Sequence, residues 1–308
     1  MNPFARPWFA DLALLGVVII WGFTFPMIKT ATEHAPVFGF LTLRFALACM
    51  AFMPLLALRT RLGAGLRPCL FPGILAGASL LLGYAFQTFG LRGTSSTMGG
   101  FLTGTAVVLV PIGAALFLGH GVKRSEWIGV ALVALGLPFL SGVGGEALHF
   151  GTGELLVLGC ALAFAVQILV VGEHAPKLDP VWFTLVQCLV VLVASALLSC
   201  YFESGSFHLL FTPGVLSAVA FTGVLATTLA FWVQTEAQRH TSAVHVVLIF
   251  SLEPVFAAIA GAWLAGDELT RPQIAGAAAM FAGSLVAGIG PLIRVRTATS
   301  PSSASREC

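Results

Sequence analysis

The chain has 308 residues, of which 58% are hydrophobic and only 9% are charged, and its mean hydropathy is +0.97. A water-soluble domain carries about 25% charged residues, so this composition excludes an ordinary soluble protein. The net charge of +2 comes from basic residues scattered over short polar segments, which excludes the basic stripe typical of nucleic-acid binding. The composition predicts an all-α, polytopic membrane protein in contact with the lipid bilayer.

Ten apolar windows are long enough to cross a bilayer, which takes about 20 residues in helix. In chain order they span 10–29, 36–58, 69–91, 97–118, 126–143, 153–172, 181–202, 213–236, 241–264 and 272–292. The opening segment MNPFARPWFADLALLG has no small-residue cleavage site, so we expect it to begin the first crossing. The Ser/Thr-rich end, 294–308, has nothing to bury and is expected to be a disordered cytoplasmic tail.

Lys and Arg are distributed unequally between alternate loops. One side holds eleven of them: Arg6, Arg59, Arg61, Arg67, Lys123, Arg124, Lys177, Arg239, Arg294, Arg296 and Arg306. The other side holds Lys29, Arg92 and Arg271. Because cytoplasmic loops are enriched in basic residues, we expect both termini to be cytoplasmic, in the cell (inner) membrane.

An internal repeat has an offset of 147 residues. The segments QTFGLRGTSS (87–96) and QTEAQRHTSA (234–243) share Gln-Thr, an Arg and Thr-Ser at the same positions, and glycines 129 and 136 correspond to glycines 276 and 283. We therefore expect a first repeat in 1–150 and a second in 151–293. Each copy holds five crossings, an odd number, so the second copy must be inverted relative to the first, an architecture typical of secondary transporters.

The prolines of the repeat-related helices do not correspond. At the same offset, Pro254 matches Val107 and Pro111 matches Ala258. Because proline removes a helix hydrogen bond, we expect the helices at 97–118 and 241–264 to bend at different depths.

Three groups of motifs resemble a known family. They are WGFTFPMIK (21–29) with LRF (43–45), then QTFGLRGTSSTMGGFLTGTAVVLVP (87–111), and finally QTEAQRHTSAVHVVLIFSLEPVFAAIAGAWLAGDELTRPQIAG (234–276). Over nearly the whole chain the sequence resembles the EamA-type family of the drug/metabolite transporter superfamily. One departure is the loop GHGVKRSEW (119–127), which lacks the Gly-Glu pair that the second copy has at 266–268 as Gly-Asp-Glu.

The resemblance implies a fold and a class of function. It implies ten transmembrane helices in two inverted five-helix repeats, around a central cavity lined largely by 10–29, 69–91, 97–118, 153–172, 213–236 and 241–264. Members of this family typically export amino acids, other metabolites or toxic compounds, and some take up solutes.

Glu253 lies twelve residues into the window at 241–264, near the bilayer midplane. A charge there is costly, so the side chain is expected to face a cavity, find a partner or take a proton. One interpretation is a protonatable cavity residue that couples solute movement to protons, which His245 passes toward the cytoplasmic side. The other is a protonated carboxyl that hydrogen-bonds a carbonyl freed by Pro254. The sequence leaves both open.

Arg44 is also too deep in the membrane to be ignored. It could bind anionic groups of a solute or pair with a carboxylate, but a packing role, through bonds to carbonyls or by extending outward, is the favoured interpretation. On the window at 10–29, Trp21, Thr24 and Pro26 lie within one and a half turns. They form either a bent aromatic and hydroxyl platform for a small solute or an ordinary kink.

Further polar and aromatic residues are candidates for the cavity, although each is equally suited to bonding between helices. They are Tyr84, Gln87, Thr103, Gln167, Gln187, Trp232, Gln234 and His245.

Several function classes find no support in the sequence. No phosphate loop, nucleophile elbow or spaced metal-ligand cluster is visible, so we expect no enzyme, no catalytic residues, no metal and no cofactor. Without a nucleotide-binding domain, the energy source must be an ion gradient or the solute's own. The sequence predicts a secondary transporter of a small organic solute, acting as an exporter by alternating access, as a monomer or weak homodimer. The alternative is a passive channel or a membrane receptor.

Overall fold

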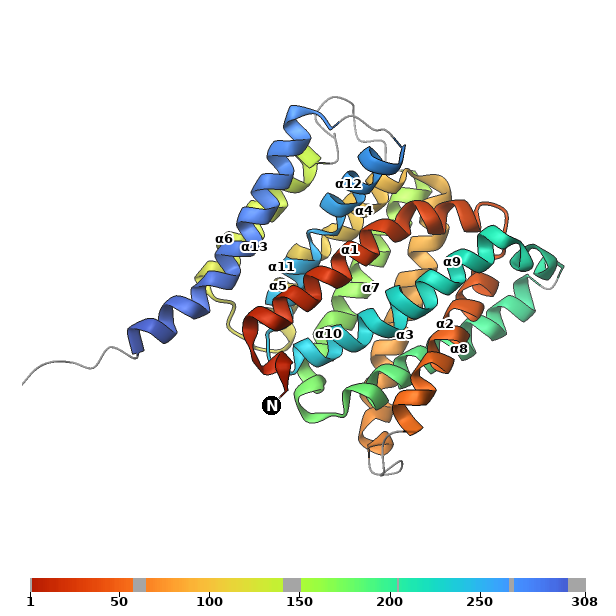
Figure 1. Ribbon diagram of the computed structural model, residues 1–308, viewed down its shortest axis with the longest axis horizontal. Helices are drawn as coiled ribbons and strands as arrows, with labels where there is room; N and C mark the ends of the chain where they lie inside the picture. Colours follow the sequence, from red (N-terminus) through yellow and green to blue (C-terminus); the bar gives the residue numbers. More distant parts are fainter. Residues whose placement is uncertain (1, 58–64, 141–150, 204, 266–268, 299–308) are drawn as a thin grey trace, which may run out of the picture.

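The computed structural model describes residues 2–57, 65–140, 151–203, 205–265 and 269–298. Within these ranges all regular secondary structure is helical, and no strand is present. Figure 1 shows the helices as a bundle coloured along the chain. The all-α prediction is confirmed for this part of the chain.

Each repeat supplies five helical segments. The first repeat contains α1 (Pro7–Thr32), α2 (Val37–Ala57), α3 (Leu66–Gly93), α4 (Ser96–Gly104) followed by α5 (Ala106–Phe117), and α6 (Arg124–Leu140). The second contains α7 (Thr152–His174), α8 (Pro180–Phe202), α9 (Pro213–Gly223) continuing through a π-helical turn η4 (Val224–Leu229) into α10 (Ala230–Gln238), α11 (Ala243–Phe250) followed by α12 (Glu253–Ala265), and α13 (Arg271–Ala298). Short 3₁₀ turns lie at η1 (Pro3–Ala5), η2 (Ala175–Lys177) and η3 (Phe207–Phe211).

Eight helical segments are long and apolar enough to cross a membrane. They are Pro7–Thr32, Val37–Ala57, Leu66–Gly93, Met98–Phe117, Thr152–Lys177, Pro180–Phe202, Pro213–Gln238 and Ala243–Ala260. In the described part of the chain, α6 and α13 are not among them. The 17 residues of α6 are about 26 Å long at 1.5 Å per residue, short of a hydrocarbon core of about 30 Å. Ten crossings therefore stay a prediction.

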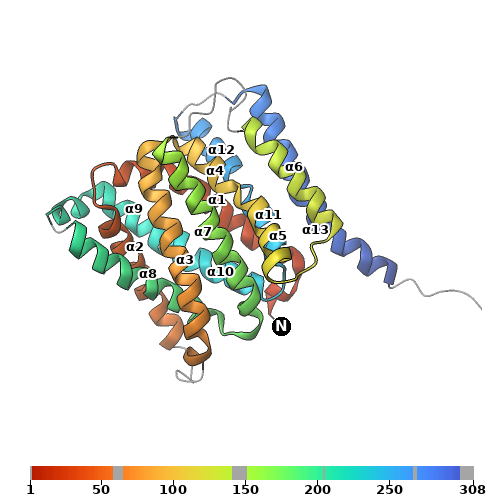
Figure 2. The same cartoon turned by 180° about the vertical axis from the view of Figure 1, so that it is seen from behind.

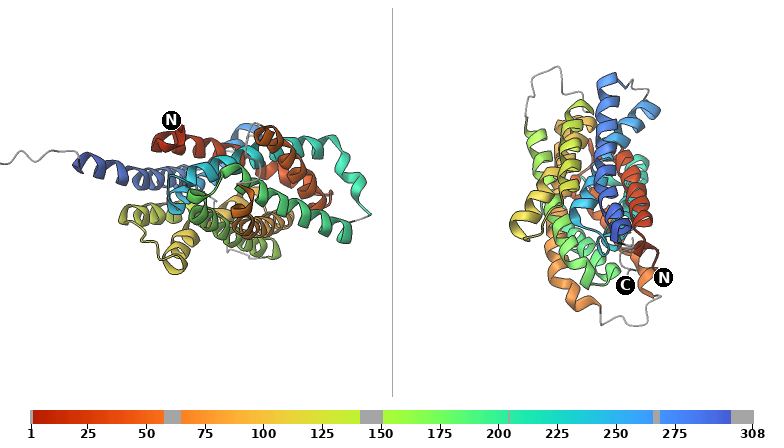
Figure 3. Two further views of the ribbon diagram at one scale, coloured as in Figure 1. Left: turned by 90° about the horizontal axis from the view of Figure 1, so that it is seen from below. Right: turned by 90° about the vertical axis from the view of Figure 1, so that its left-hand side faces the viewer.

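The C-terminal helix extends beyond its predicted end. α13 continues to Ala298, into the segment that the sequence predicted to be disordered. Figure 3 shows this end of α13 extending past the rest of the bundle. Residues 299–308 and the departure at 266–268 lie outside the described residues.

The two repeats have matching local structure at the offset of 147. Ser95 caps α4 by accepting a hydrogen bond from the amide of Met98 at 3.1 Å, and Ser242 caps α11 by accepting one from the amide of His245 at 3.1 Å. These four residues are related by the same offset. The shared Thr-Ser motif is thus a pair of equivalent helix starts.

The crossings formed by α4–α5 and α11–α12 are both interrupted, and the interruptions are equivalent. The amides of Thr105 and Val108 bond to carbonyls three residues earlier, at 3.2 and 3.0 Å. The amides of Leu252 and Val255 do the same, both at 3.0 Å. All four positions correspond at the offset of 147. Each crossing therefore has a tight 3₁₀-type turn at the same depth.

The prediction that these two helices bend at different depths is wrong, because their prolines do not set the interruptions. Pro111 lies inside α5, which continues through it. Pro254 is the second residue of α12, where a helix needs no proline N–H. Pro26 likewise lies inside α1, which is assigned as one helix from Pro7 to Thr32.

Hydrogen bonds at the two ends of the bundle show that the repeats are inverted. Arg92, at the end of α3, donates to the carbonyls of Thr32 at 2.8 Å and Ala35 at 2.6 Å, between α1 and α2. Its counterpart Arg239 follows α10 and contacts Glu236, which accepts a hydrogen bond from Asn2, before α1. Because α1 separates these two places, equivalent residues lie at opposite ends of the bundle.

Helices α6 and α13 lie side by side at one edge of the bundle (Figures 1 and 2). They approach so closely that a Cβ on Gly136 would lie 2.6 Å from the carbonyl oxygen of Gly276, and one on Gly283 would lie 2.7 Å from that of Gly129. The repeat exchanges these two contacts, since Gly129 corresponds to Gly276 and Gly136 to Gly283. Repeat-related glycines therefore let the last helices of the two halves pack backbone to backbone.

Candidate functional site

A cavity of about 60 Å³ lies among α1, α2, α3, α4, α5, α7, α10, α11 and α12. It brings together nine of the twelve residues that the sequence offers for a cavity: Trp21, Thr24, Arg44, Tyr84, Gln87, Thr103, Gln167, Gln234 and Glu253. The other lining residues are Gly104, Ala106, Phe164, Ile168, Phe231, Val247, Phe250 and Ser251. The helices that the family resemblance implies all contribute, and α2 adds Arg44.

Both repeats supply lining residues from equivalent positions. Gln87 and Gln234 face the cavity from α3 and α10, and the offset of 147 also relates Gly104 to Ser251 and Ala106 to Glu253. The latter two pairs flank the interruptions at Thr105 and Leu252, so the equivalent turn of each half lies beside the cavity. The cavity thus lies between the two halves and is asymmetric in charge.

Trp21 and Thr24 bring an indole ring and a hydroxyl group from α1 to the cavity wall. The Trp21 indole donates to the carbonyl of Ala226 at 2.9 Å, and its ring lies 4.8 Å from the ring of Phe250 between centroids. The Thr24 hydroxyl donates to the Trp21 carbonyl at 2.7 Å. Hydrogen bonding therefore fixes the indole as a wall of the cavity.

Arg44 is almost fully buried, with 1% of its surface exposed. Its Nε donates to Thr227 Oγ1 at 2.8 Å, and its Nη2 donates to the Tyr84 hydroxyl at 2.9 Å. The guanidinium carbon also lies 4.2 Å from the centroid of the Tyr84 ring, within cation–π distance. Among the residues that the structure describes, Arg44 neither pairs with a carboxylate nor bonds to a carbonyl, the two arrangements considered from the sequence.

Glu253 is half-buried and faces the same cavity from the first turn of α12. No hydrogen bond joins its carboxyl to a backbone carbonyl or another group in the described part of the chain. Pro254 is the second residue of α12, a position at which proline is tolerated in a helix. The structural interpretation from the sequence, a bond to a carbonyl freed by Pro254, therefore has no counterpart in the structure.

A chain of four buried glutamines joins α7, α8 and α10. Gln167 donates to Gln187 at 3.0 Å, and Gln234 donates to both Gln167 and Gln238 at 3.0 Å. Gln238 in turn donates to the carbonyl of Ile168 at 2.9 Å. Gln167 and Gln234 line the cavity, while Gln187 and Gln238 support them from behind. These bonds fix the amide groups that face the cavity.

Trp232 and His245, two of the predicted cavity residues, lie elsewhere. Trp232 packs edge-on against Phe4, at 5.9 Å between centroids, beside a surface hollow near the N-terminus. His245 lies in the first turn of α11, with Nε2 2.8 Å from Asp11 Oδ1. The interruption at Leu252 separates His245 from the helix that holds Glu253, so the two do not share one straight helical face.

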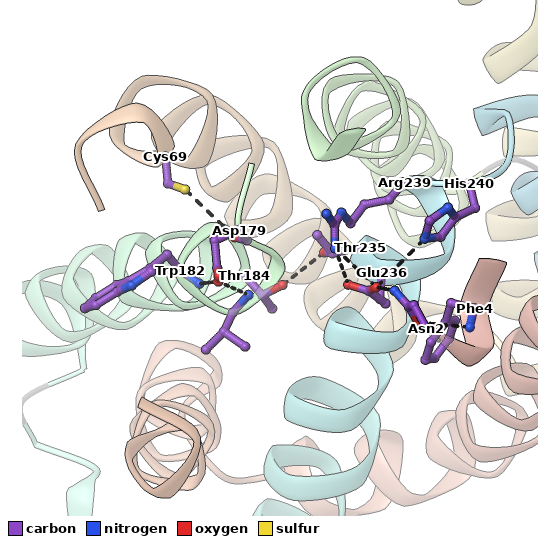
Figure 4. A network of polar contacts seen from close by, with 11 residues as sticks. Asn2, Phe4, Cys69, Asp179, Trp182, Thr184, Thr235, Glu236, Arg239 and His240 are labelled. Atoms are coloured by element: carbon purple, nitrogen blue, oxygen red, sulfur yellow. Dashed lines mark hydrogen bonds and ion pairs between the residues drawn. The ribbon is translucent and has the colours of Figure 1, made fainter. Parts of the chain in front are cut away.

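The end of α10 near Trp232 holds a polar network of its own. Figure 4 shows Glu236 facing Asn2, Arg239 and His240, and Thr184 bonded to Thr235 at 3.0 Å. This network links the N-terminal segment to α10, outside the cavity.

The comparisons with known proteins concern nearly the whole chain. The sequence model of the EamA-like transporter family matches residues 8–142 and again residues 151–289. The chain belongs to this family. It is therefore a membrane transporter, and the resemblance inferred from the motifs is confirmed.

Curated relatives of this EamA-like transporter are named as transporters or exporters. It is 34% identical to an uncharacterized transporter of Archaeoglobus fulgidus, over 87% of this chain and 82% of that protein. It is 26% identical to a probable amino-acid metabolite efflux pump of Salmonella typhimurium, over 93% of this chain and 96% of the pump. It is also 28% identical to the threonine/homoserine exporter RhtA of the same species, over 71% and 70%.

A solved crystal structure has the same fold. It superposes on this EamA-like transporter with a TM-score of 0.74 and 17% sequence identity, and the match covers 94% of this chain and 99% of the other. At this identity the match shows the fold alone.

Sequence reasoning missed the π-helical turn η4 of this transporter. Thr227 and Thr228 donate to carbonyls five residues earlier, at 2.8 and 3.0 Å, and so stabilise the wider turn. The turn presents the Ala226 carbonyl to Trp21 and the Thr227 hydroxyl to Arg44. π-Helical turns are frequent at functional sites. In the sequence, the pair Thr227-Thr228 within an apolar helix is the signal for this turn, but such a pair also occurs in ordinary α-helices.

The charges at the cavity come from single residues and do not form a metal site. In the ranges that the structure describes, no group of three or more His, Cys, Asp or Glu side chains is placed to hold a metal ion. Arg44 and Glu253 are the charged residues of the lining. The cavity can therefore bind a ligand through Arg44, Glu253 and the uncharged polar side chains of its lining.

Proposed function

We propose that this EamA-like protein is a secondary transporter that exports a small organic solute across the cytoplasmic membrane by alternating access. In this proposal both termini are cytoplasmic, and α6 and α13 complete ten crossings. The cavity described above is the solute site.

The observation that carries the proposal is a polar cavity between two inverted repeats, lined by equivalent residues of both. Two similar halves of opposite orientation can exchange roles, so that one central site opens first to one side and then to the other. The equivalent turns at Thr105 and Leu252 give each half the same point at which to bend.

The size of the cavity supports a moving carrier over an open pore. Its volume of about 60 Å³ is far below the ~300–1,000 Å³ of ordinary small-molecule pockets. A solute can bind only if the surrounding helices move apart. A passive channel would instead need a continuous wide path.

The names of the relatives support amino acids as the solute class and export as the direction. The cavity suits such solutes because it combines aromatic walls with amide, hydroxyl and charged groups. Glu253 is the proposed proton-coupling residue: its carboxyl faces the cavity without a hydrogen-bond partner in the described part of the chain. A carboxyl that releases its proton when an amino group approaches can exchange one for the other.

Solute counterflow in liposomes tests the proposal. Purified protein is reconstituted into liposomes loaded with a high concentration of one unlabelled amino acid, and the uptake of labelled amino acid is followed. An alternating carrier exchanges the two and transiently concentrates label inside for at least one amino acid. Labelled solute that only equilibrates would indicate a channel, and no flux for any amino acid would contradict the proposal.

A further inference from the structure

Three buried polar atoms around the cavity have no hydrogen-bond partner. In the described part of the chain, four buried side-chain atoms lack one: Arg44 Nη1, Thr103 Oγ1, Gln234 Oε1 and Arg239 Nε. The first three belong to residues that line the cavity. Because buried polar groups are nearly always satisfied, each such atom needs an explanation. Their gathering at one cavity indicates a ligand that supplies the missing partners.

Hydrogen bonds fix Nε and Nη2 of the Arg44 guanidinium, while Nη1 has no partner in the described part of the chain. Thr227 and Tyr84 accept from Nε and Nη2, and the Tyr84 ring lies against the guanidinium. All of these partners are uncharged, and neither Glu253 nor another described carboxylate forms an ion pair with Arg44. An arginine keeps its charge in proteins, and a buried charge is normally paired. Arg44 is therefore a preorganised cation without an anion.

The other two atoms complement a different part of the same ligand. Gln234 Oε1 can only accept a hydrogen bond, and its amide is fixed because its Nε2 already donates to Gln167 and Gln238. The thiol of Cys160, a weak hydrogen-bonding group, lies beside Thr103 Oγ1 and does not satisfy it. Residues that line the cavity thus carry a cationic donor, a hydroxyl and a fixed acceptor, each without a partner in the described part of the chain.

We propose that Arg44 Nη1 binds the carboxylate of the transported solute, while Gln234 Oε1 accepts from an N–H group of the same molecule. This proposal rests on the transport function proposed above and names the side chains that recognise the solute: Arg44 for its carboxylate and Gln234 for its N–H donor. A charge-assisted bond from a buried, preorganised guanidinium is strong, so the carboxylate is the group that the site requires. The packing role favoured for Arg44 from the sequence explains Nε and Nη2 but leaves Nη1 unexplained.

Binding of matched pairs of probes tests this assignment on the full-length protein. The probes are L-threonine, L-leucine and L-phenylalanine, each compared with the amine that lacks its carboxylate: 1-amino-2-propanol, 3-methylbutylamine and 2-phenylethylamine. Thermal unfolding of the detergent-purified protein is followed as each probe is titrated. We expect at least one amino acid to raise the unfolding temperature, and its amine to bind at least tenfold more weakly. Equal binding of acid and amine, or no binding of any amino acid, would overturn the proposal.

Arg44→Gln tests the residue directly. This variant should lose at least tenfold in affinity for the amino acid while its affinity for the amine stays unchanged. Arg92→Gln is the matched control, since Arg92 bonds the carbonyls of Thr32 and Ala35 away from the cavity, and it should bind both probes as the unaltered protein does. If Arg44→Gln does not fold, the comparison of acid with amine on the unaltered protein decides the matter.

Two results would overturn the role of Arg44 without overturning the proposed transport function. Counterflow of amines or of uncharged solutes, with no preference for carboxylates, would leave the carrier standing and overturn the role of Arg44. An Arg44→Gln variant that keeps its affinity for the acid would do the same.

Discussion

Glu253 and Arg44 approach the cavity from different repeats and differ in their surroundings. Arg44 is fixed by two hydrogen bonds and an aromatic ring, whereas Glu253 has no hydrogen-bond partner in the described part of the chain. A fixed cation suits constant recognition of one group of the solute. A carboxyl without a partner suits a change of protonation during the cycle, because no hydrogen bond or ion pair in the described part of the chain has to break when it gains or loses a proton.

Glu253→Gln should separate coupling from exchange. Glutamine keeps the size and hydrogen-bonding capacity of the side chain but cannot ionise. In liposomes, transport driven by a pH gradient should vanish, while exchange of labelled for unlabelled solute without a gradient should persist. A variant that still concentrates solute under a proton gradient would show that Glu253 is structural.

Single residues also show where prediction from sequence ends. Nine cavity residues could be chosen from the sequence because polar side chains deep in apolar helices rarely face lipid. Trp232 and His245 were chosen on the same argument, but they pack against Phe4 and Asp11 near the ends of their helices. Polarity in a window predicts that a residue avoids lipid, whereas its partner depends on tertiary packing.

At the scale of whole helices, the repeat predicted more than the prolines did. The repeat offset related Ser95 to Ser242, and the structure shows that both serines cap the start of a helix. Proline positions failed to place the bends, because the 3₁₀-type turns at Thr105 and Leu252 precede Pro111 and Pro254. The π-helical turn in the crossing formed by α9 and α10 could not be predicted, because a Thr-Thr pair also fits an ordinary α-helix and two groups that bond to the turn, Trp21 and Arg44, come from other helices. Backbone irregularities that line a cavity are satisfied by tertiary contacts, which local sequence does not reveal.

The contact between α6 and α13 can be tested by substitution of one glycine. Gly276→Leu should destabilise the protein, because the added Cβ alone would lie 2.6 Å from the Gly136 carbonyl and the Leu140 amide. Overpacking of this kind costs about 1–3 kcal/mol, and backbone atoms cannot move aside easily. Thermal unfolding in detergent measures the effect.

Gly16→Leu is the matched control for Gly276→Leu. Gly16 lies within α1, and a Cβ there would meet nothing within 4 Å. The Gly16→Leu variant should keep the unfolding temperature unchanged or raise it slightly, since leucine favours helix more than glycine does. Equal losses in the two variants would show that the close approach of α6 and α13 does not stabilise the fold.

The molecule as a whole has basic loops gathered at one end. Lys177 and Arg239 line one hollow with Asn2, and Lys177 also pairs with Glu173 at 3.5 Å. The opposite end carries Lys29 and Arg92, which bond to backbone carbonyls. From the positive-inside rule we expect the first end to face the cytoplasm.

Cysteine labelling of intact cells checks this orientation. In a protein whose six native cysteines are replaced by alanine, His208→Cys should react with a membrane-impermeant thiol reagent added outside, and Lys177→Cys should not. Both positions are exposed, so accessibility depends only on the side of the membrane. The reverse pattern would refute cytoplasmic termini.

Alternating access predicts that one buried position is reached from both sides. Thr103→Cys, in the same cysteine-free protein, places a thiol of similar size in the cavity wall. Labelling is measured in right-side-out and inside-out vesicles with a small impermeant reagent, with and without saturating transported amino acid. Thr103→Cys should react in both kinds of vesicle and be protected by the amino acid in both, while His208→Cys reacts from one side only. Reaction of Thr103→Cys from a single side under every condition would contradict a central site that opens alternately to the two sides of the membrane.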